Sequence, residues 1–203
     1  FADELGKRSD AFARCIMSVS FMAPLPAFNV GPAAVDGVPD AVAALSRSRV
    51  VMIVMDRFWR DTPAVAHLSA GLDAAGIAAV FYDGFSGEPK SADIVAIADM
   101  GRRADVDVVI GLGGGAALDA AKIASICITG GQDVEFYAYG ANPLPEAVLP
   151  SILIPTTAGT GSEANGTAIF TTRAGKKGWI YGAALTARLA VLDPDLTASL
   201  PPA

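Results

Sequence analysis

The sequence predicts an α/β fold in which a Rossmann-like parallel sheet is flanked by helices. Short apolar runs alternate with helical patterns along most of the chain, as is typical of parallel strands joined by crossover helices. The run VVMIVM at 50–55 is apolar throughout, which indicates a strand covered on both faces. Three glycines at 113–115 follow another apolar run and precede a helical pattern, which is typical of a phosphate-binding turn.

The elements follow one another in a regular order. Short apolar runs predict strands at 50–55, 78–82, 106–111 and 152–154. Helical patterns predict helices at 63–75, 91–104 and 116–128. We expect Thr62 and Ser91 to be N-caps, with Pro63 at the first helical position and Gly76 after the end of that helix.

Beyond Asn165 the helical patterns stop, and a small β-hairpin region is expected near the C-terminus. Short strands are predicted at 167–172, 179–181 and 189–192. The sequence GKKG at 175–178 is typical of a hairpin turn. Prolines are expected to stop the segment 193–203, and residues 1–17 are compatible with a helix that carries no recognisable chemistry.

Composition excludes several classes of protein. A net charge of −6 argues against a nucleic-acid surface, which needs basic stripes. Cys15 and Cys127 have no metal-like spacing, so a reduced, cytoplasmic setting fits best. No apolar run is long enough to span a membrane, and the N-terminus lacks the order of a signal peptide. His67 is the single histidine, and we expect it to be structural because no second ligand accompanies it.

The glycine loop, residues 113–115, is the first candidate for chemistry. Gly111, Gly113 and Ala116 fit the G-x-G-x-x-A form of the dinucleotide fingerprint, and the alternative is a tight turn without a ligand. Asp119 and Lys122 follow on one face of the helix. Asp119 is suited to accept from a sugar hydroxyl or a nicotinamide amide, and its alternative role is a surface salt bridge with Lys122.

A carboxylate for the cofactor ribose is the second candidate. The fingerprint would place it about twenty residues on, near Asp133 or Glu135, but the glycine loop does not belong to the first crossover. Asp56 is the better candidate, because it follows the strand at 50–55 at its carboxyl end, where open α/β sheets bind ligands. Arg57 beside it weakens a preference for NAD, since arginine can accept a 2′-phosphate. The alternative role of Asp56 is a helix N-cap.

The threonine loop, residues 156–162, is the third candidate. It carries four hydroxyl side chains, namely Thr156, Thr157, Thr160 and Ser162. Hydroxyls donate and accept, which suits ribose and pyrophosphate. The alternative is an ordinary turn rich in serine and threonine, which fits poorly with an apolar lead-in followed by proline.

These loops resemble those of the iron-dependent (group III) alcohol dehydrogenases. GGGAALDAAK at 113–122 resembles the family motif GGGSxxDxAK, and PTTAGTGSE at 155–163 matches the family's most characteristic stretch. VLDPDLTASLP at 191–201 resembles the family segment DPxLTxSLP, and the likeness runs from about Phe28 to the last residue. The resemblance implies one NAD(P)-binding α/β domain at 1–203, with 1–27 as an N-terminal extension to which no role is assigned.

The resemblance also implies the cofactor contacts. It assigns them to Asp56, Gly114, Gly115, Thr156, Thr157, Thr160, Lys177 and Leu196. Gly113, Ala116, Asp119 and Ser162 complete the expected site. Ala116 stands where the family has serine, so one hydroxyl donor to phosphate is absent. We expect NAD to be preferred and NADP to be the alternative, because Asp56 would repel a 2′-phosphate.

In the family an all-helical, metal-binding domain follows, and it is absent from this chain. The family's metal ligands, an aspartate and three histidines, lie beyond the matched stretch, so no metal ligand is assigned here. Fe²⁺ or another divalent metal is expected only in a full-length protein, and the 203-residue chain alone is expected to be inactive. The implied reaction is hydride transfer that oxidises a small alcohol or reduces an aldehyde, and the implied assembly is a homodimer or larger homo-oligomer.

Two other functions fit the sequence. One is a nucleotide-binding module without catalysis. The other is a carbon–oxygen lyase similar to dehydroquinate synthase, whose nucleotide loop is alike, although the stretch at 156–163 argues against it.

Overall fold

A computed structural model describes residues 24–198 and has a six-stranded sheet at its centre. Neighbouring strands are parallel, in the order β1-β8-β5-β4-β2-β3. The strands are β1 (Ala27–Val30), β2 (Val50–Met55), β3 (Ala78–Tyr82), β4 (Val108–Gly113), β5 (Ser151–Pro155) and β8 (Leu189–Leu192). This architecture confirms the predicted fold class.

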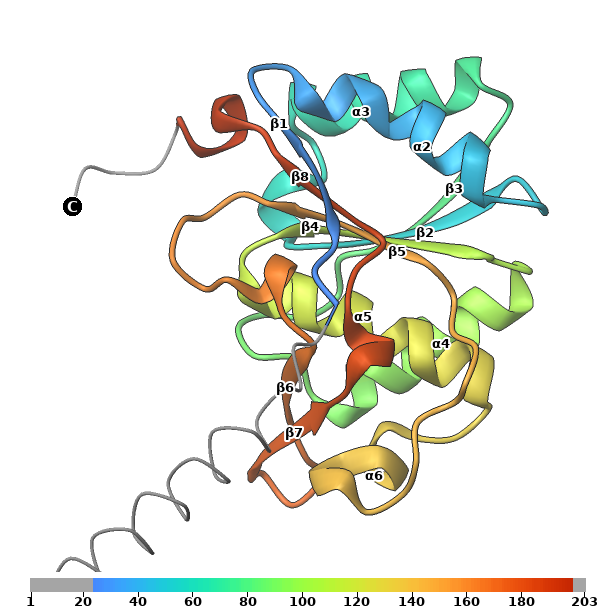
Figure 1. Cartoon of the computed structure of the whole chain (residues 1–203), viewed down its shortest axis with the longest axis vertical. Helices are drawn as coiled ribbons and strands as arrows, with labels where there is room; N and C mark the ends of the chain where they lie inside the picture. Colours follow the sequence, from blue (N-terminus) through green and yellow to red (C-terminus); the bar gives the residue numbers. More distant parts are fainter. Residues whose placement is uncertain (1–23, 199–203) are drawn as a thin grey trace, which may run out of the picture.

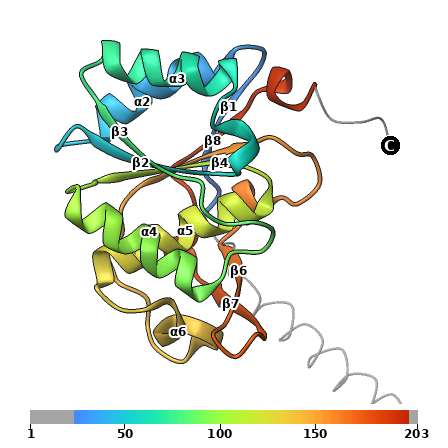
Figure 2. The same cartoon turned by 180° about the vertical axis from the view of Figure 1, so that it is seen from behind.

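Helices cover both faces of the sheet, which gives three layers (Figure 1). One face carries α2 (Val38–Leu45) and α3 (Pro63–Ala74). The other carries α4 (Ser91–Arg103) and α5 (Gly115–Gly130). The view from behind shows the same layers, with the short helix α6 (Val134–Tyr137) beyond α4 and α5 (Figure 2).

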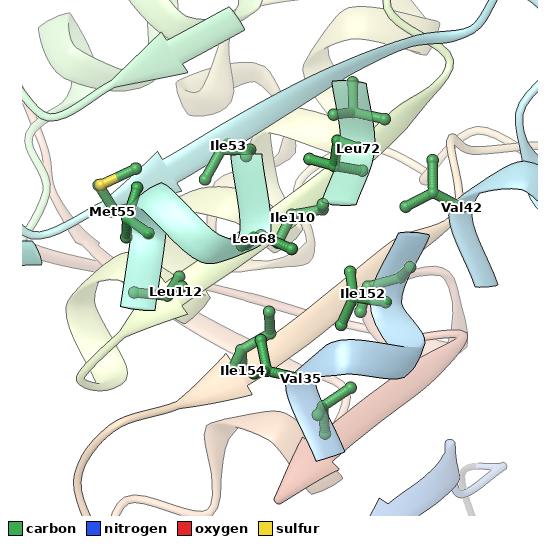
Figure 3. Packing of buried hydrophobic residues seen from close by; sticks show 14 of the residues in the cluster. Val35, Val42, Ile53, Met55, Leu68, Leu72, Ile110, Leu112, Ile152 and Ile154 are labelled. Carbon is green, nitrogen blue, oxygen red and sulfur yellow. The ribbon is translucent and has the colours of Figure 1, made fainter. Parts of the chain in front are cut away.

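Side chains of the central strands are buried alternately on the two faces. Ile53 and Met55 of β2 pack toward α2 and α3, whereas Met52 and Val54 pack toward α4 and α5. Strands β4 and β5 follow the same period. Figure 3 shows the first of these clusters, in which Val42, Leu68, Leu72, Ile110, Leu112, Ile152 and Ile154 meet. Because both faces are covered, these strands are apolar throughout, which is why sequence alone indicated them.

Helix α5 lies unusually close to the sheet. A Cβ on Gly111 would lie 2.8 Å from the Ala121 side chain and 2.9 Å from that of Leu153. Gly111 is inside β4, so it provides helix–strand packing rather than the turn in which the fingerprint would place its first glycine. The predicted strand at 106–111 is therefore shifted, and the helix predicted from Ala116 begins at Gly115.

A two-stranded antiparallel hairpin packs on the far side of α4 and α5. Its strands are β6 (Thr167–Thr171) and β7 (Lys177–Tyr181). Phe170 and Ile180 of the hairpin share a buried cluster with Ile123 of α5. The turn closes earlier than predicted, between Thr172 and Lys176, and Gly178 lies inside β7 because a Cβ there would be 2.8 Å from the Phe170 ring.

Other expectations need correction. The segment 189–192 is a strand, but it joins the main sheet as β8 and does not belong to the hairpin region. Strand β1 and helix α2 were not predicted. Ser91 is not an N-cap: Lys90 holds that position, the Asp93 carboxylate accepts from the Lys90 N–H at 2.8 Å, and the Ser91 hydroxyl donates to Glu135 at 2.6 Å.

Helix α3 begins as predicted. The Thr62 hydroxyl accepts from the Val65 N–H, and Pro63 is the first helical residue. The expectations for residues 1–17, for Cys15 and for 199–203 lie outside the described residues. Within residues 24–198, no helix is both long and apolar enough to cross a membrane.

Candidate functional site

The carboxyl ends of β2 and β4 form the switch point of the sheet. After β2 the chain enters α3 on one face, and after β4 it enters α5 on the other. Because the two loops diverge between neighbouring strands, a crevice opens there, and open α/β sheets bind their ligands at such points. Asp56 and the glycine loop are the residues that flank this crevice.

Asp56 and the glycine loop are in direct contact. Asp56 Oδ2 accepts a hydrogen bond from the Gly114 N–H at 3.0 Å. Asp56 holds the N-cap position of the short 3₁₀ helix Arg57–Trp59, yet its side chain makes no capping hydrogen bond. Asp56 is thus an N-cap by position only, and its carboxylate lies against the loop that was expected to bind phosphate.

Space requires glycine at Gly113 and Gly115, but not at Gly114. Gly113 has φ 145°, and a Cβ on it would lie 2.3 Å from Asp56 Oδ2. Gly114 is the N-cap of α5, where a Cβ would meet only ordinary contacts with Thr157 at 3.6 Å. Gly115 would bring a Cβ to 3.0 Å from Thr160. A branched side chain at Gly114 would thus fit the fold while filling the space in front of the helix N-terminus.

The threonine loop lies beside the glycine loop. The Thr156 N–H donates to the Gly113 carbonyl at 3.0 Å, and Thr156 is buried. Thr157 is half-buried and Thr160 is exposed, with Thr160 Oγ1 accepting from the Ser162 N–H at 3.3 Å. The side chains of Thr157 and Thr160 lie next to Gly114 and Gly115, so the two loops adjoin at this edge of the sheet.

A buried lysine fixes the two loops relative to each other. Lys122 of α5 has a side chain that is 0% exposed, and its Nζ lies 3.0 Å from Asp119 Oδ1. Lys122 Nζ also donates to the Ser162 carbonyl at 2.9 Å and to the Thr167 carbonyl. The helix that starts at the glycine loop thereby holds the segment that ends the threonine loop.

Asp119 completes this buried network. Its carboxylate accepts from the Ser162 hydroxyl and, at 2.9 Å, from the Ile169 N–H. The alternative role, a salt bridge with Lys122, is therefore present, but it is not at the surface: the Asp119 side chain is 13% exposed and that of Lys122 is 0% exposed. Burial lowers the pKa of Lys122, and the Asp119 charge opposes this shift. Asp119 and Ser162 are thus engaged within the fold.

A cavity of about 460 Å³ lies next to the threonine loop. Thr157 and Gly159 line one side, and Gly31 and Leu192, after β1 and at the end of β8, line the other. Glu163 and Asp193 are its acidic residues. The cavity lies at the carboxyl ends of β1, β5 and β8, on the same edge of the sheet as the switch point.

The remaining expected contacts are less close to this centre. Leu196 is buried in the core cluster beneath β5 and β8. Lys177 is exposed at the start of β7, with its Nζ 3.2 Å from Glu88 Oε2. Ala116 is half-buried in the first turn of α5. The fingerprint's alternative acids serve elsewhere: Asp133 caps α6, and Glu135 accepts from Ser91.

His67 lies on the surface of α3, with its Nε2 2.9 Å from Asp36 Oδ1, as expected of a structural histidine. Within residues 24–198, no group of three or more histidine, cysteine, aspartate or glutamate side chains is placed to hold a metal ion.

Two contacts at the carboxyl edge of the sheet were missed from the sequence. Asp193 is buried and accepts from the Val35 N–H at 3.1 Å, which ties the end of β8 to the segment after β1. Asp83, directly after β3, pairs with Arg57 at 2.8 Å. Each contact joins residues far apart in the chain. The one hint in the sequence was that Asp193 and Asp83 each directly follow a strand.

Comparison with known proteins gives one consistent family. The model for iron-containing alcohol dehydrogenase matches residues 26–194. The sulfoacetaldehyde reductase of Bilophila wadsworthia (strain 3_1_6) is 39% identical over 137 residues, covering 66% of this chain and 35% of the reductase. The probable alcohol dehydrogenase EutG of Escherichia coli (strain K12) is 33% identical over 181 residues, covering 86% of this chain and 45% of EutG.

Solved structures agree. The sulfoacetaldehyde reductase from Bifidobacterium kashiwanohense, in complex with NAD⁺, has a TM-score of 0.80 at 28% identity and covers 87% of this chain and 46% of its own. The alcohol dehydrogenase from Oenococcus oeni has a TM-score of 0.82 at 28% identity, and the match covers 90% of this chain and 48% of that enzyme's chain. This chain spans less than half of each of these four relatives. A carbon–oxygen lyase finds no support among them.

Proposed function

The chain belongs to the iron-containing alcohol dehydrogenase family, and we propose that it binds NAD(H) as the nucleotide-binding domain of an alcohol or aldehyde oxidoreductase. The observation that carries this proposal is the hydrogen bond from the Gly114 N–H to Asp56 at the switch point. It holds the carboxylate proposed to bind ribose against the N-terminus of α5, where the proposal puts the pyrophosphate. A relative of known structure is an NAD⁺ complex, which supports the choice of cofactor.

The residues present fit a dinucleotide. Within the glycine loop, Gly114 has room around it at the N-terminus of α5, where backbone N–H groups and the helix dipole favour a pyrophosphate. Asp56 would accept from the hydroxyls of a ribose, and Thr157 and Thr160 would donate to phosphate or sugar oxygens. The cavity beside the threonine loop has room for a flat ring. When bound, the cofactor supplies the hydride acceptor or donor.

The described residues contribute position and electrostatics to this reaction. Lys122 and Asp119 hold the two loops at a fixed separation, and so they would determine where the cofactor lies. Asp119 and Ser162, first expected to contact the cofactor, are proposed instead to position the loops, because their side chains are bonded to each other. Lys177 and Leu196 stay as candidate contacts on the resemblance alone.

A metal ion does not fit the described residues. Residues 24–198 offer no cluster of ligands, so no step is assigned to iron here. The substrate is proposed only as a small alcohol or aldehyde, since the named relatives include a sulfoacetaldehyde reductase and alcohol dehydrogenases. A homodimer or larger homo-oligomer is proposed for the whole protein by the same resemblance.

Titration calorimetry with NADH tests the proposal through Gly114→Val. The variant places a branched side chain in the phosphate position, where a Cβ meets only ordinary contacts. We expect NADH affinity to fall about a hundredfold, the loss of two phosphate hydrogen bonds at about 1.5 kcal/mol each.

The matched control is Ala141→Val, which adds bulk at an exposed residue between α6 and β5. It should bind NADH as the unmodified chain does, and both variants should keep the far-UV circular dichroism of the parent. Unchanged NADH affinity in folded Gly114→Val would show that the glycine loop does not bind the cofactor.

A further inference from the structure

Asp56 and Arg57, the two residues that follow β2, form contacts on opposite sides of that strand. Asp56 Oδ2 accepts from Gly114 after β4, and Arg57 Nη1 lies 2.8 Å from Asp83 Oδ2 after β3. Strand β2 lies between β4 and β3, and Val54 is in register with Tyr82, so β2 and β3 end at the same level. The carboxylate at the crevice and the neighbouring guanidinium therefore diverge.

The Asp83 side chain is much less exposed than that of Arg57. The Asp83 side chain is 19% exposed and that of Arg57 is 72% exposed. A guanidinium has five donors in a planar fork that suits phosphate, and one of them serves the contact with Asp83. Removal of Asp83 would leave the exposed Arg57 side chain without this carboxylate and able to turn toward the crevice.

Other charges near this edge have their own contacts. The Arg60 guanidinium lies 4.1 Å from the centre of the Phe81 ring, on β3. Asp93 accepts from the Tyr82 hydroxyl at 3.4 Å. Arg57 therefore differs from Arg60. It is next to Asp56 in the chain, and its contact is with the Asp83 carboxylate at the same edge of the sheet.

We propose that Asp83 is a positioning residue for cofactor choice, which holds Arg57 on the β3 side of β2 and so prevents it from binding the 2′-phosphate of NADP. The inference rests on the proposed function, since it needs the adenosine ribose to lie at Asp56. Discrimination against NADP then has two parts. Asp56 repels the phosphate directly, and Asp83 removes the cation that would attract it.

Titration of the chain with NADH and NADPH tests this with four variants and a matched control. In Asp83→Ala, NADPH should bind about tenfold more tightly, the effect of one charge-assisted hydrogen bond, while NADH affinity stays within about twofold. Asp83→Glu keeps the carboxylate and should keep the parent's weak NADPH binding. Arg57→Met should change neither affinity by more than about twofold.

The double variant Asp83→Ala/Arg57→Met separates the two effects of the carboxylate. If Arg57 donates to the 2′-phosphate, the gain in NADPH affinity disappears; if the gain persists, Asp83 acts through its own charge and the inference is wrong. Asp99→Ala is the matched control, because Asp99 forms a similar pair with Arg102 at 2.6 Å on α4 and should leave both affinities unchanged.

The outcomes separate the two proposals. Unchanged NADPH affinity in folded Asp83→Ala, or a tenfold loss of NADPH affinity in Arg57→Met, overturns the inference and leaves the proposed function intact. If the unmodified chain binds neither cofactor, the proposed function fails and the inference fails with it.

Discussion

The glycine loop and the threonine loop lie side by side, joined by the Thr156 N–H and the Gly113 carbonyl, yet they are held by different means. The glycine loop is crowded: a Cβ on Gly113 would collide with Asp56, and one on Gly115 would press on Thr160. The threonine loop is open around Gly159 and Gly161, where a Cβ would meet nothing within 4 Å. Its shape depends on polar contacts with Lys122 and Asp119 at its far end.

This difference separates local from distant causes. The glycine loop follows from its own residues, because small size and a helix start are enough to form a phosphate-binding turn. The threonine loop needs Lys122, which lies about forty residues earlier in the chain, on helix α5. A change that breaks the distant contact should therefore disturb the threonine loop, whereas a change in the glycine loop should have a local effect.

The largest effect is expected from Lys122→Met. The substitution leaves the Asp119 carboxylate buried without its cation and leaves the Ser162 and Thr167 carbonyls without a donor. We expect a loss of about 3–5 kcal/mol in the free energy of unfolding, as for other broken buried ion pairs. Urea denaturation followed by circular dichroism measures it.

The double variant Lys122→Met/Asp119→Asn is the control for this prediction. Removing both charges should restore part of the stability, because no uncompensated charge is left. A single variant that loses less than about 1 kcal/mol would show that the pair acts like a surface salt bridge, and that the threonine loop is held by its own residues.

Gly113→Ala compared with Gly159→Ala is expected to have the next largest effect. Both glycines have positive φ, 145° and 125°, but only Gly113 has a neighbour in the way, Asp56 Oδ2 at 2.3 Å. We expect Gly113→Ala to cost about 2–4 kcal/mol, from strain and overpacking together. Gly159→Ala should cost about 1–2 kcal/mol from strain alone. Equal losses in thermal unfolding would contradict the distinction between a crowded and an open loop.

The same distinction explains which parts the sequence could predict. The apolar runs at 50–55 and 78–82 are strands with the expected bounds. A strand covered on both faces is apolar along its whole length, so its own sequence shows where it begins and ends. The hydrogen-bonded position of Asp56 at the sheet edge also followed from its place directly after a strand. These features depend on a few neighbouring residues.

Features that depend on distant partners were misread. The segment at 189–192 has the right pattern for a strand, but its place in the main sheet depends on pairing with β1 and β5. Strand β1 is short, exposed at every residue and preceded by no periodic pattern, so local sequence carries little signal for it. Asp119 and Lys122 have surface-like spacing on a helix, and only the hairpin that covers α5 makes them buried.

Asp56→Gly tests, through cofactor affinity, whether the carboxylate next to the glycine loop faces the ribose. It removes the carboxylate that faces the ribose and the acceptor of the Gly114 N–H. We expect NADPH to bind about tenfold more tightly and NADH a few times more weakly, because repulsion and one hydrogen bond are lost. Thr157→Val in the threonine loop is the control, and it should weaken both cofactors equally. An NADPH dissociation constant that stays the same in titrations of Asp56→Gly would mean that the ribose lies elsewhere.

The smallest effect, and a gain, is expected from Ala116→Ser. Ala116 lies in the first turn of α5, directly after the glycine loop, and is half-buried. A hydroxyl at this position adds a donor toward the phosphate site without adding a branched carbon, so the crowded loop should accept it. One neutral hydrogen bond contributes about 0.5–1.5 kcal/mol, which predicts NADH affinity about two- to tenfold higher in calorimetry. Thr160→Ser keeps a hydroxyl in the open loop and should change affinity by less than about twofold. If Ala116→Ser leaves NADH affinity unchanged while the fold is intact, the first turn of α5 does not face the phosphates, and the glycine loop would serve packing alone.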